Sequence, residues 1–235
     1  MMEEKQVTLS FQKIVSDFKH ILVMFFLMAP MCLIISTIAV FYPDALKVLQ
    51  VSSSTPWGIV TSLFANRNMN ASFSNLGAFL FYLILFVLGN LFLSPNERRR
   101  RSLYLSLSTF LGAIIANTYW LLHYPQAPAL GTSSIVYGLE GAVLVFSIAN
   151  LFFVRQLTWY AEKIKKKLAI SWAFNLILAL IISTHITYEL LNYTALLAAK
   201  VNVLVHWISF WGCACLTLFW FLIRSLKLFR KPSMV

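Results

Sequence analysis

The feature that most constrains this chain is a succession of six apolar runs, each close to the length that a helix needs to cross a bilayer. A spanning helix takes roughly 20 apolar residues. The 235 residues are 60% hydrophobic and 11% charged, whereas soluble domains are about 45–50% apolar and about 25% charged. This pattern excludes a soluble enzyme and a disordered chain, and it predicts an all-α polytopic membrane protein, a six-helix bundle. The expected spans are Ile21–Tyr42, Asn70–Leu93, Leu103–Leu122, Ser133–Val154, Leu168–Tyr188 and Val201–Ile223.

Lysine and arginine are divided very unevenly between the two sides of such a bundle. Sixteen of the nineteen fall in segment 1–20, in the loops after the second and fourth spans, and in segment 224–235. Because positive residues are retained in the cytoplasm, we expect both termini to be cytoplasmic. The membrane domain is then 21–223, between a cytoplasmic N-terminal segment and a basic tail. The net charge of +11 is accounted for by this topology, and no nucleic-acid partner is expected.

The cysteines give no sign of a disulfide framework or of a metal site. Cys32, Cys213 and Cys215 all lie in apolar runs, and none belongs to a zinc-binding spacing. No cofactor motif accompanies them. We therefore expect neither a metal ion nor a cofactor.

The junction before the fourth span carries the first polar group of interest, Gly131-Thr132-Ser133-Ser134. Serine and threonine at this position are ordinary helix caps. Glycine ahead of a serine at a loop-to-helix junction can also expose a nucleophile beside free backbone N–H groups, which together with the helix dipole stabilise an oxyanion. Both interpretations of Ser133 are open at this point.

A histidine a few residues into the sixth span is the candidate base. His206 is expected at nearly the depth of Ser133, because both spans enter from the outer side and a helix rises about 1.5 Å per residue. A serine becomes nucleophilic when a base takes its proton. The alternative is a packed, hydrogen-bonded histidine. His185 and His123, near the outer ends of other spans, are rival bases.

Two further polar residues share the helical face of Ser133. Offsets of four and seven place Tyr137 and Glu140 there. Tyr137 is expected to pack against an imidazole. Glu140 is expected near mid-membrane in protonated or hydrogen-bonded form, with either a helix-packing role or a role in proton supply or gating. Small residues on the fourth and sixth spans predict that these two helices pack together.

These residues resemble the rhomboid family of intramembrane serine proteases. The family places G-x-S at the start of its fourth span and a tyrosine four residues later, which correspond here to Gly131, Ser133 and Tyr137. Its sixth-span histidine corresponds to His206. The resemblance covers all six spans in order. It implies Ser133 as nucleophile and His206 as general base, a catalytic dyad without an aspartate.

A third block of the resemblance lies in the long, half-apolar first outer loop, Pro43–Met69, which is expected to lie in the membrane interface, and in the start of the second span. The family's tryptophan, threonine and final asparagine correspond to Trp57, Thr61 and Asn75, which implies that Asn75 and the Ser133 backbone N–H form the oxyanion hole. The family's arginine and two histidines are replaced, and Asn70 is a possible substitute donor. The replacing residues are Gly58, Asn66 and Ala71.

The function that this resemblance implies is hydrolysis of single-span transmembrane substrates near the outer leaflet of the lipid bilayer by a Ser–His dyad. One alternative is a catalytically weak or inactive rhomboid-like pseudoprotease that binds membrane clients, which the replaced residues favour. A second alternative is a small transporter or channel that uses Glu140.

Overall fold

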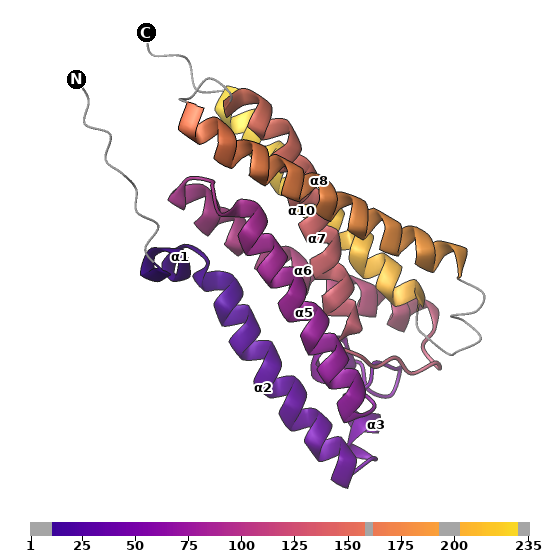
Figure 1. Cartoon of the computed structure of the whole chain (residues 1–235). Helices are drawn as coiled ribbons and strands as arrows, with labels where there is room; N and C mark the ends of the chain where they lie inside the picture. Colours follow the sequence, from indigo (N-terminus) through magenta and orange to yellow (C-terminus); the bar gives the residue numbers. More distant parts are fainter. Residues whose placement is uncertain (1–10, 158–161, 193–202, 230–235) are drawn as a thin grey trace.

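The computed structural model describes residues 11–157, 162–192 and 203–229, and the described chain is a bundle of helices (Figure 1). Its elements in chain order are α1 (Phe11–Asp17), α2 (Lys19–Phe41), α3 (Ala45–Leu49), α4 (Gly58–Thr61), η1 (Ser62–Phe64), α5 (Met69–Asn90), α6 (Pro95–His123), α7 (Ser133–Leu157), α8 (Glu162–Leu191) and α10 (Val203–Phe229).

Six of these helices, α2, α5, α6, α7, α8 and α10, are long and apolar enough to cross a membrane. Each contains or closely overlaps one of the six apolar runs, so the predicted all-α polytopic class is confirmed. The chain is a multi-pass membrane protein.

The third membrane helix begins well before the predicted start of its apolar run. Helix α6 starts at Pro95, eight residues before Leu103, and the four arginines from Arg98 to Arg101 therefore lie within it. The side chain of Ser94 caps this end by accepting a hydrogen bond from the Glu97 N–H at 3.4 Å. Proline is favoured in the first turn, where its missing N–H costs nothing. The Ser94 cap and Pro95 set the start of α6, and hydropathy alone cannot detect such signals.

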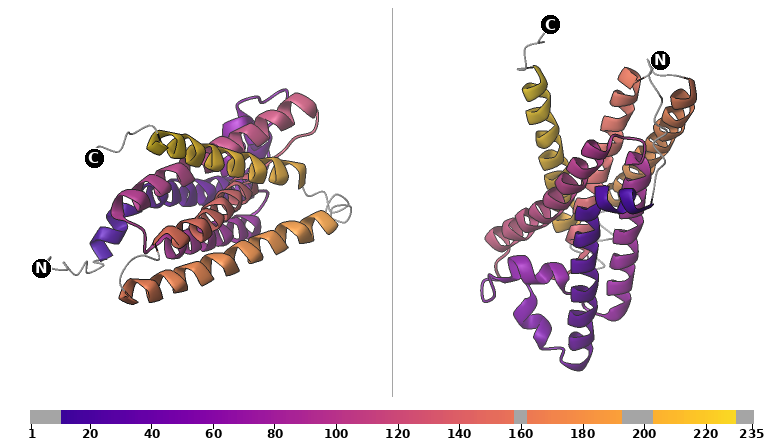
Figure 2. Two further views of the ribbon diagram at one scale, coloured as in Figure 1. Left: turned by 90° about the horizontal axis from the view of Figure 1, so that it is seen from above. Right: turned by 90° about the vertical axis from the view of Figure 1, so that its left-hand side faces the viewer.

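Helix α7 is the central helix of the bundle. In an 18-residue apolar stretch of α7, 61% of the residues are buried, against 28–44% in the corresponding stretches of the other five membrane helices. Seen from above, α7 lies between α8 and α10 (Figure 2). Ser133 begins this helix, so the candidate nucleophile is carried by the most enclosed element of the fold.

Small residues bring α7 and α10 into close contact, as the sequence predicts. A Cβ atom on Gly141 would lie 2.2 Å from the Phe210 carbonyl oxygen, and one on Gly138 would lie 2.6 Å from the Cys213 sulfur. The Ser209 hydroxyl also donates to the Ser134 carbonyl at 2.5 Å. These contacts fix the rotation and depth of α10 relative to α7, and thereby the position of His206.

The first loop is folded back on the bundle as short helical turns (Figure 1). Thr61 donates to the Leu49 carbonyl at 2.9 Å, and the indole of Trp57 donates to the Val48 carbonyl at 2.7 Å. Asn117 of α6 donates to the Ile59 carbonyl at 2.9 Å. An isolated bridge pairs Val51 with Ala129, just before Gly131. The loop is therefore tied to the segment that leads into Ser133.

A buried polar cluster joins four helices at the other end of α7. Arg101 of α6 donates to Asn90 of α5 at 2.8 Å and to Asn150 of α7 at 2.5 Å. Asn150 and Asn175 of α8 each donate to the Gly89 carbonyl at 3.1 Å. The Arg101 guanidinium also lies over the rings of Phe146 and Phe221. We call Arg101, Asn90, Asn150 and Asn175 the Arg101 cluster.

Candidate active site

The start of α7 is shaped by a glycine that no other residue type could easily replace. Gly131 has φ +146°, a conformation that L side chains rarely adopt. A Cβ atom there would also lie 3.1 Å from the Ser133 hydroxyl oxygen. Gly131 therefore turns the chain into α7 while leaving space beside Ser133, whose side chain is partly exposed.

Ser133 and His206 meet at hydrogen-bonding distance, although 73 residues separate them in the chain. The His206 Nε2 atom lies 2.9 Å from the Ser133 Oγ atom. His206 is 7% exposed, so the imidazole is held in a largely water-free environment. This contact agrees with the similar membrane depths that the sequence predicts for Ser133 and His206. A serine hydroxyl against a histidine nitrogen is the arrangement of a nucleophile and its base.

Tyr137 stacks on the imidazole of His206, one helical turn after Ser133. The ring centroids are 4.1 Å apart and the ring planes are inclined by 11°. The Tyr137 hydroxyl donates a hydrogen bond to the Glu189 carboxylate of α8. Tyr137 therefore contacts an imidazole as the sequence predicts, and it links α8 to that imidazole.

Neither rival histidine contacts Ser133, although His185 lies near the Tyr137 ring. His185 of α8 donates through Nδ1 to Glu140 at 2.7 Å. His123, at the end of α6, stacks on Tyr119 and lies 3.0 Å from the Tyr119 carbonyl oxygen. Glu140 is 1% exposed, so its pairing with His185 supplies the hydrogen bond that a buried carboxylate requires. His206 alone of these three contacts Ser133.

Asn66 is the centre of the polar network on the other side of Ser133. Its amide nitrogen donates to the Thr132 hydroxyl at 2.8 Å. Its amide oxygen accepts from Asn75 at 2.8 Å and from the Thr132 N–H at 3.3 Å. Asn75 therefore lies next to the loop that carries Ser133, with one of its two amide hydrogens directed to Asn66.

The substitute donor that the sequence offered is placed differently. Asn70 is exposed at the start of α5. The N–H of Ala71 donates to the Asn68 side chain at 2.8 Å, which caps α5. The structure thus brings Asn75 towards the site through Asn66, and it leaves Asn70 at the surface.

Two residues of the site carried no assigned role in the sequence analysis. Asn66 figured there only as the replacement of a family histidine, and Glu189 did not figure at all. Glu189 lies one residue past the predicted fifth span but within the membrane helix of the structure, which runs to Leu191. An acidic residue at the end of an apolar span is itself a signal, because a carboxylate there is costly without a partner. That signal would have singled out Glu189, whereas nothing in the local pattern indicates that Asn66 bonds to Thr132.

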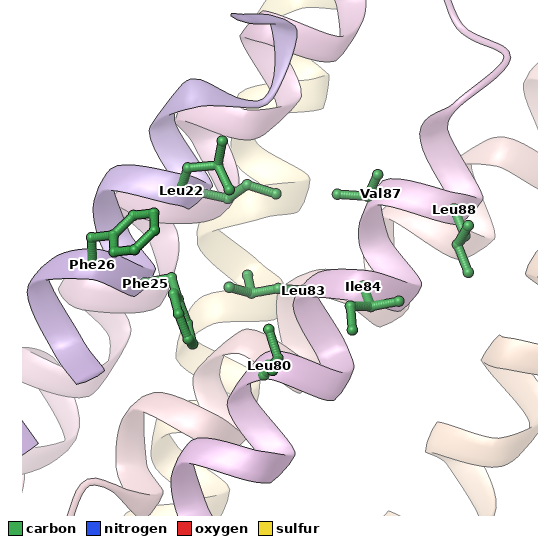
Figure 3. A pocket seen from close by; sticks show the side chains of 9 residues that line it. Leu22, Phe25, Phe26, Leu80, Leu83, Ile84, Val87 and Leu88 are labelled. Carbon is green, nitrogen blue, oxygen red and sulfur yellow. The ribbon is translucent and has the colours of Figure 1, made fainter. Parts of the chain in front are cut away.

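Outside the dyad, the described residues hold a second ionisable pair, His185 and Glu140, and an apolar groove. Within them, no group of three or more His, Cys, Asp or Glu side chains could hold a metal ion. A groove of about 310 Å³ between α2 and α5 is lined only by apolar side chains, among them Phe25, Leu83 and Val87 (Figure 3). Such a surface suits hydrocarbon and provides no catalytic group.

Fold and site together define a class, a multi-pass all-α membrane protein with a partly buried Ser–His pair at one end of its central helix. Comparison of the chain with protein-family models, with curated proteins and with solved structures finds no match in any of the three. The functional argument therefore rests on the residues and the geometry of the chain itself.

Proposed function

We propose that this protein is a rhomboid-like intramembrane serine protease that uses Ser133 and His206 as a catalytic dyad. The observation that carries the proposal is the 2.9 Å separation of Ser133 Oγ and His206 Nε2. The stacking of Tyr137 on His206 and the glycine turn at Gly131 support it, because both hold the two reacting groups in place.

The chemistry follows from these positions. His206 Nε2 accepts the Ser133 proton as Oγ attacks the carbonyl carbon of the substrate, and the resulting imidazolium gives that proton to the leaving amine. The acyl-enzyme formed on Ser133 is then hydrolysed by water that His206 activates in the same way. The developing oxyanion is stabilised by the Ser133 backbone N–H in the first turn of α7, whose N–H groups have no partner within the helix, and by the Asn75 amide.

The position of the dyad in the membrane helices supports a proposal for the substrate class. A dyad at the end of α7 reaches peptide bonds near one leaflet, and the distribution of positive charge supports the outer leaflet. We propose single-span transmembrane proteins as substrates. A helical peptide bond is shielded by its own hydrogen bonds, so substrates with helix-destabilising residues near the outer end of their span are favoured.

The proposal is tested by reaction of the purified protein with a fluorophosphonate probe. The wild type is expected to be labelled and Ser133→Ala is expected not to be. Ser134→Ala is the matched control, because Ser134 is the next residue of the same helix and donates weakly to the Gly131 carbonyl at 3.4 Å. Labelling that persists in Ser133→Ala would overturn the assignment.

A second candidate function is favoured by the Asn66 network. The family histidine positions hold Asn66 and Ala71 here, and Asn75 gives one amide hydrogen to Asn66. Loss of one oxyanion donor can cost about 2.7–4 kcal/mol of transition-state stabilisation. These replacements favour a catalytically weak or inactive pseudoprotease that binds membrane clients.

Cleavage of a model transmembrane segment in detergent separates the two candidates. Product that depends on both Ser133 and His206 excludes the pseudoprotease. Co-purification of the same segment with wild type and with Ser133→Ala, without product from either, would favour client binding.

A further inference from the structure

A carboxylate of the fifth membrane helix is joined to the dyad by a single intervening side chain. Glu189 of α8 accepts the hydrogen bond of the Tyr137 hydroxyl, and the Tyr137 ring stacks on His206 at 4.1 Å. His206 in turn lies 2.9 Å from Ser133. Three helices thus contribute consecutive members of one chain of contacts, which begins at Glu189 and ends at the nucleophile.

Among the described residues, the dyad lacks the partner that usually orients a catalytic histidine. In serine hydrolases with three catalytic residues, a carboxylate accepts the Nδ1–H of the histidine and stabilises the imidazolium. Here the buried Nδ1 atom of His206 has no hydrogen-bond partner among the described residues. The orientation of the imidazole therefore depends on the Tyr137 ring that packs against its face.

We infer that Glu189 is a positioning residue for the Ser133–His206 dyad and acts through Tyr137. Its hydrogen bond holds the phenol ring in one plane, and the near-parallel ring keeps the imidazole turned with Nε2 towards Ser133. A hydrogen bond to a carboxylate also makes the phenol ring more electron-rich. The face of an electron-rich ring attracts a cation, so the imidazolium formed during the reaction is stabilised.

The surroundings of Glu189 contain other ionisable groups, which the test has to separate from it. Tyr137 and Glu140 of α7, Tyr82 of α5 and His185 of α8 all interact electrostatically within this cluster. Glu140 is bonded to His185 at 2.7 Å, and no bond joins it to Tyr137. Glu140 is therefore a buried carboxylate in the same cluster that does not belong to the chain of contacts.

Because Glu189 is carried by α8, the position of α8 affects the dyad. Helix α8 packs along α7 on the side opposite α10 (Figure 2). A displacement of α8 from α7 breaks the Glu189–Tyr137 bond and releases the ring that holds His206. The reactivity of the dyad then depends on whether α8 is seated against α7.

The inference rests on the proposed function, and the test uses the rate of Ser133 labelling by a fluorophosphonate probe in place of an unidentified substrate. Glu189→Gln keeps the size of the side chain but removes the carboxylate, and Tyr137→Phe removes the hydroxyl but keeps the stacking ring. Each is expected to slow labelling about tenfold, because small misplacements of reacting groups are costly. The double variant is expected to be no slower than the slower single variant, since both changes break one link.

The pH dependence separates this role from a merely structural one. In both Glu189→Gln and Tyr137→Phe the His206 imidazolium loses stabilisation. In a plot of labelling rate against pH, the fall in rate on the acidic side is therefore expected to move to lower pH. A packing defect alone would lower the rate at every pH and leave the acidic fall in place. Glu140→Gln is the matched control and is expected to change the labelling rate by less than about twofold, because it leaves the contacts of Glu189, Tyr137 and His206 in place.

The outcomes distinguish the inference from the function on which it rests. Glu189→Gln and Tyr137→Phe with wild-type labelling rates and profiles would overturn the inference while Ser133 labelling of the wild type upholds the protease. Additive losses in the double variant would also overturn it. Absence of Ser133 labelling in the wild type would instead overturn the proposed function. If Glu189→Gln fails to fold, Tyr137→Phe breaks the same link from its other end.

Discussion

The two ends of α7 carry polar clusters that differ in the kind of groups they contain. The Arg101 cluster joins a guanidinium of one helix to amide groups of three others, and Asn90, Asn150 and Asn175 exchange hydrogen bonds across those three helices. The cluster at Ser133 contains a hydroxyl, an imidazole, a phenol and a carboxylate. Here His206 Nδ1 and one Glu189 oxygen have no hydrogen-bond partner among the described residues.

This difference distinguishes a polar cluster that holds helices together from one that carries out chemistry. Amide groups do not titrate near neutral pH, so a network of amides around one permanent cation can only bind. Histidine, serine and carboxylate groups can pass a proton, and they do so only where a lone pair is accessible. Both clusters are buried in an apolar bundle, so each is costly unless its groups are stabilised in place.

The largest expected effect is on activity at the Ser133 end. His206→Ala is expected to lower cleavage of a model transmembrane segment by about 10⁴-fold, because Ser133 loses its base. His185→Ala is the matched control, since His185 is bonded to Glu140 and does not contact Ser133. Equal losses in both variants, measured as kcat/KM in detergent, would contradict the assignment of His206 as the base.

The next largest effect is expected on the free energy of unfolding, from a change in the Arg101 cluster at the other end of α7. Arg101→Met is expected to lower the free energy of unfolding by about 3 kcal/mol, because it leaves the buried amides of Asn90 and Asn150 without their donor. Thermal unfolding in detergent measures this. The folded fraction is expected to label at Ser133 at the wild-type rate. If Arg101→Met instead labelled slowly without losing stability, the Arg101 cluster would have a role in the chemistry and the two clusters would not differ as described.

The smallest effect is expected at Asn66, which lies at the Ser133 end but is held in three hydrogen bonds, much as the amides of the Arg101 cluster are. Asn66→Ala removes partners of Thr132 and Asn75, and the free energy of unfolding is expected to fall by about 1–2 kcal/mol. Cleavage by the folded protein is expected to fall about tenfold, because Asn75 and the loop before Ser133 are less well held. A wild-type kcat would show that the Asn66 network serves stability alone.

Sequence patterns predicted the architecture well because they depend on properties local to each segment. Hydropathy over some 20 residues identified all six spanning helices, since the bilayer imposes the same length on each. The rise of about 1.5 Å per residue placed Ser133 and His206 at similar depth. The boundary of α6 was missed because its start depends on Ser94 and Pro95 and not on hydropathy.

The sequence by itself determined the number of membrane helices, the side on which the charges gather and the polar residues near one depth. Only the tertiary structure decided that His206, and not His185 or His123, contacts Ser133, and that Glu189 and Asn66 belong to the site. Depth along a helix is a matter of counting residues. The direction in which a side chain points depends on how each helix is rotated about its axis, and here the close contact of Gly138 and Gly141 with α10 sets that rotation.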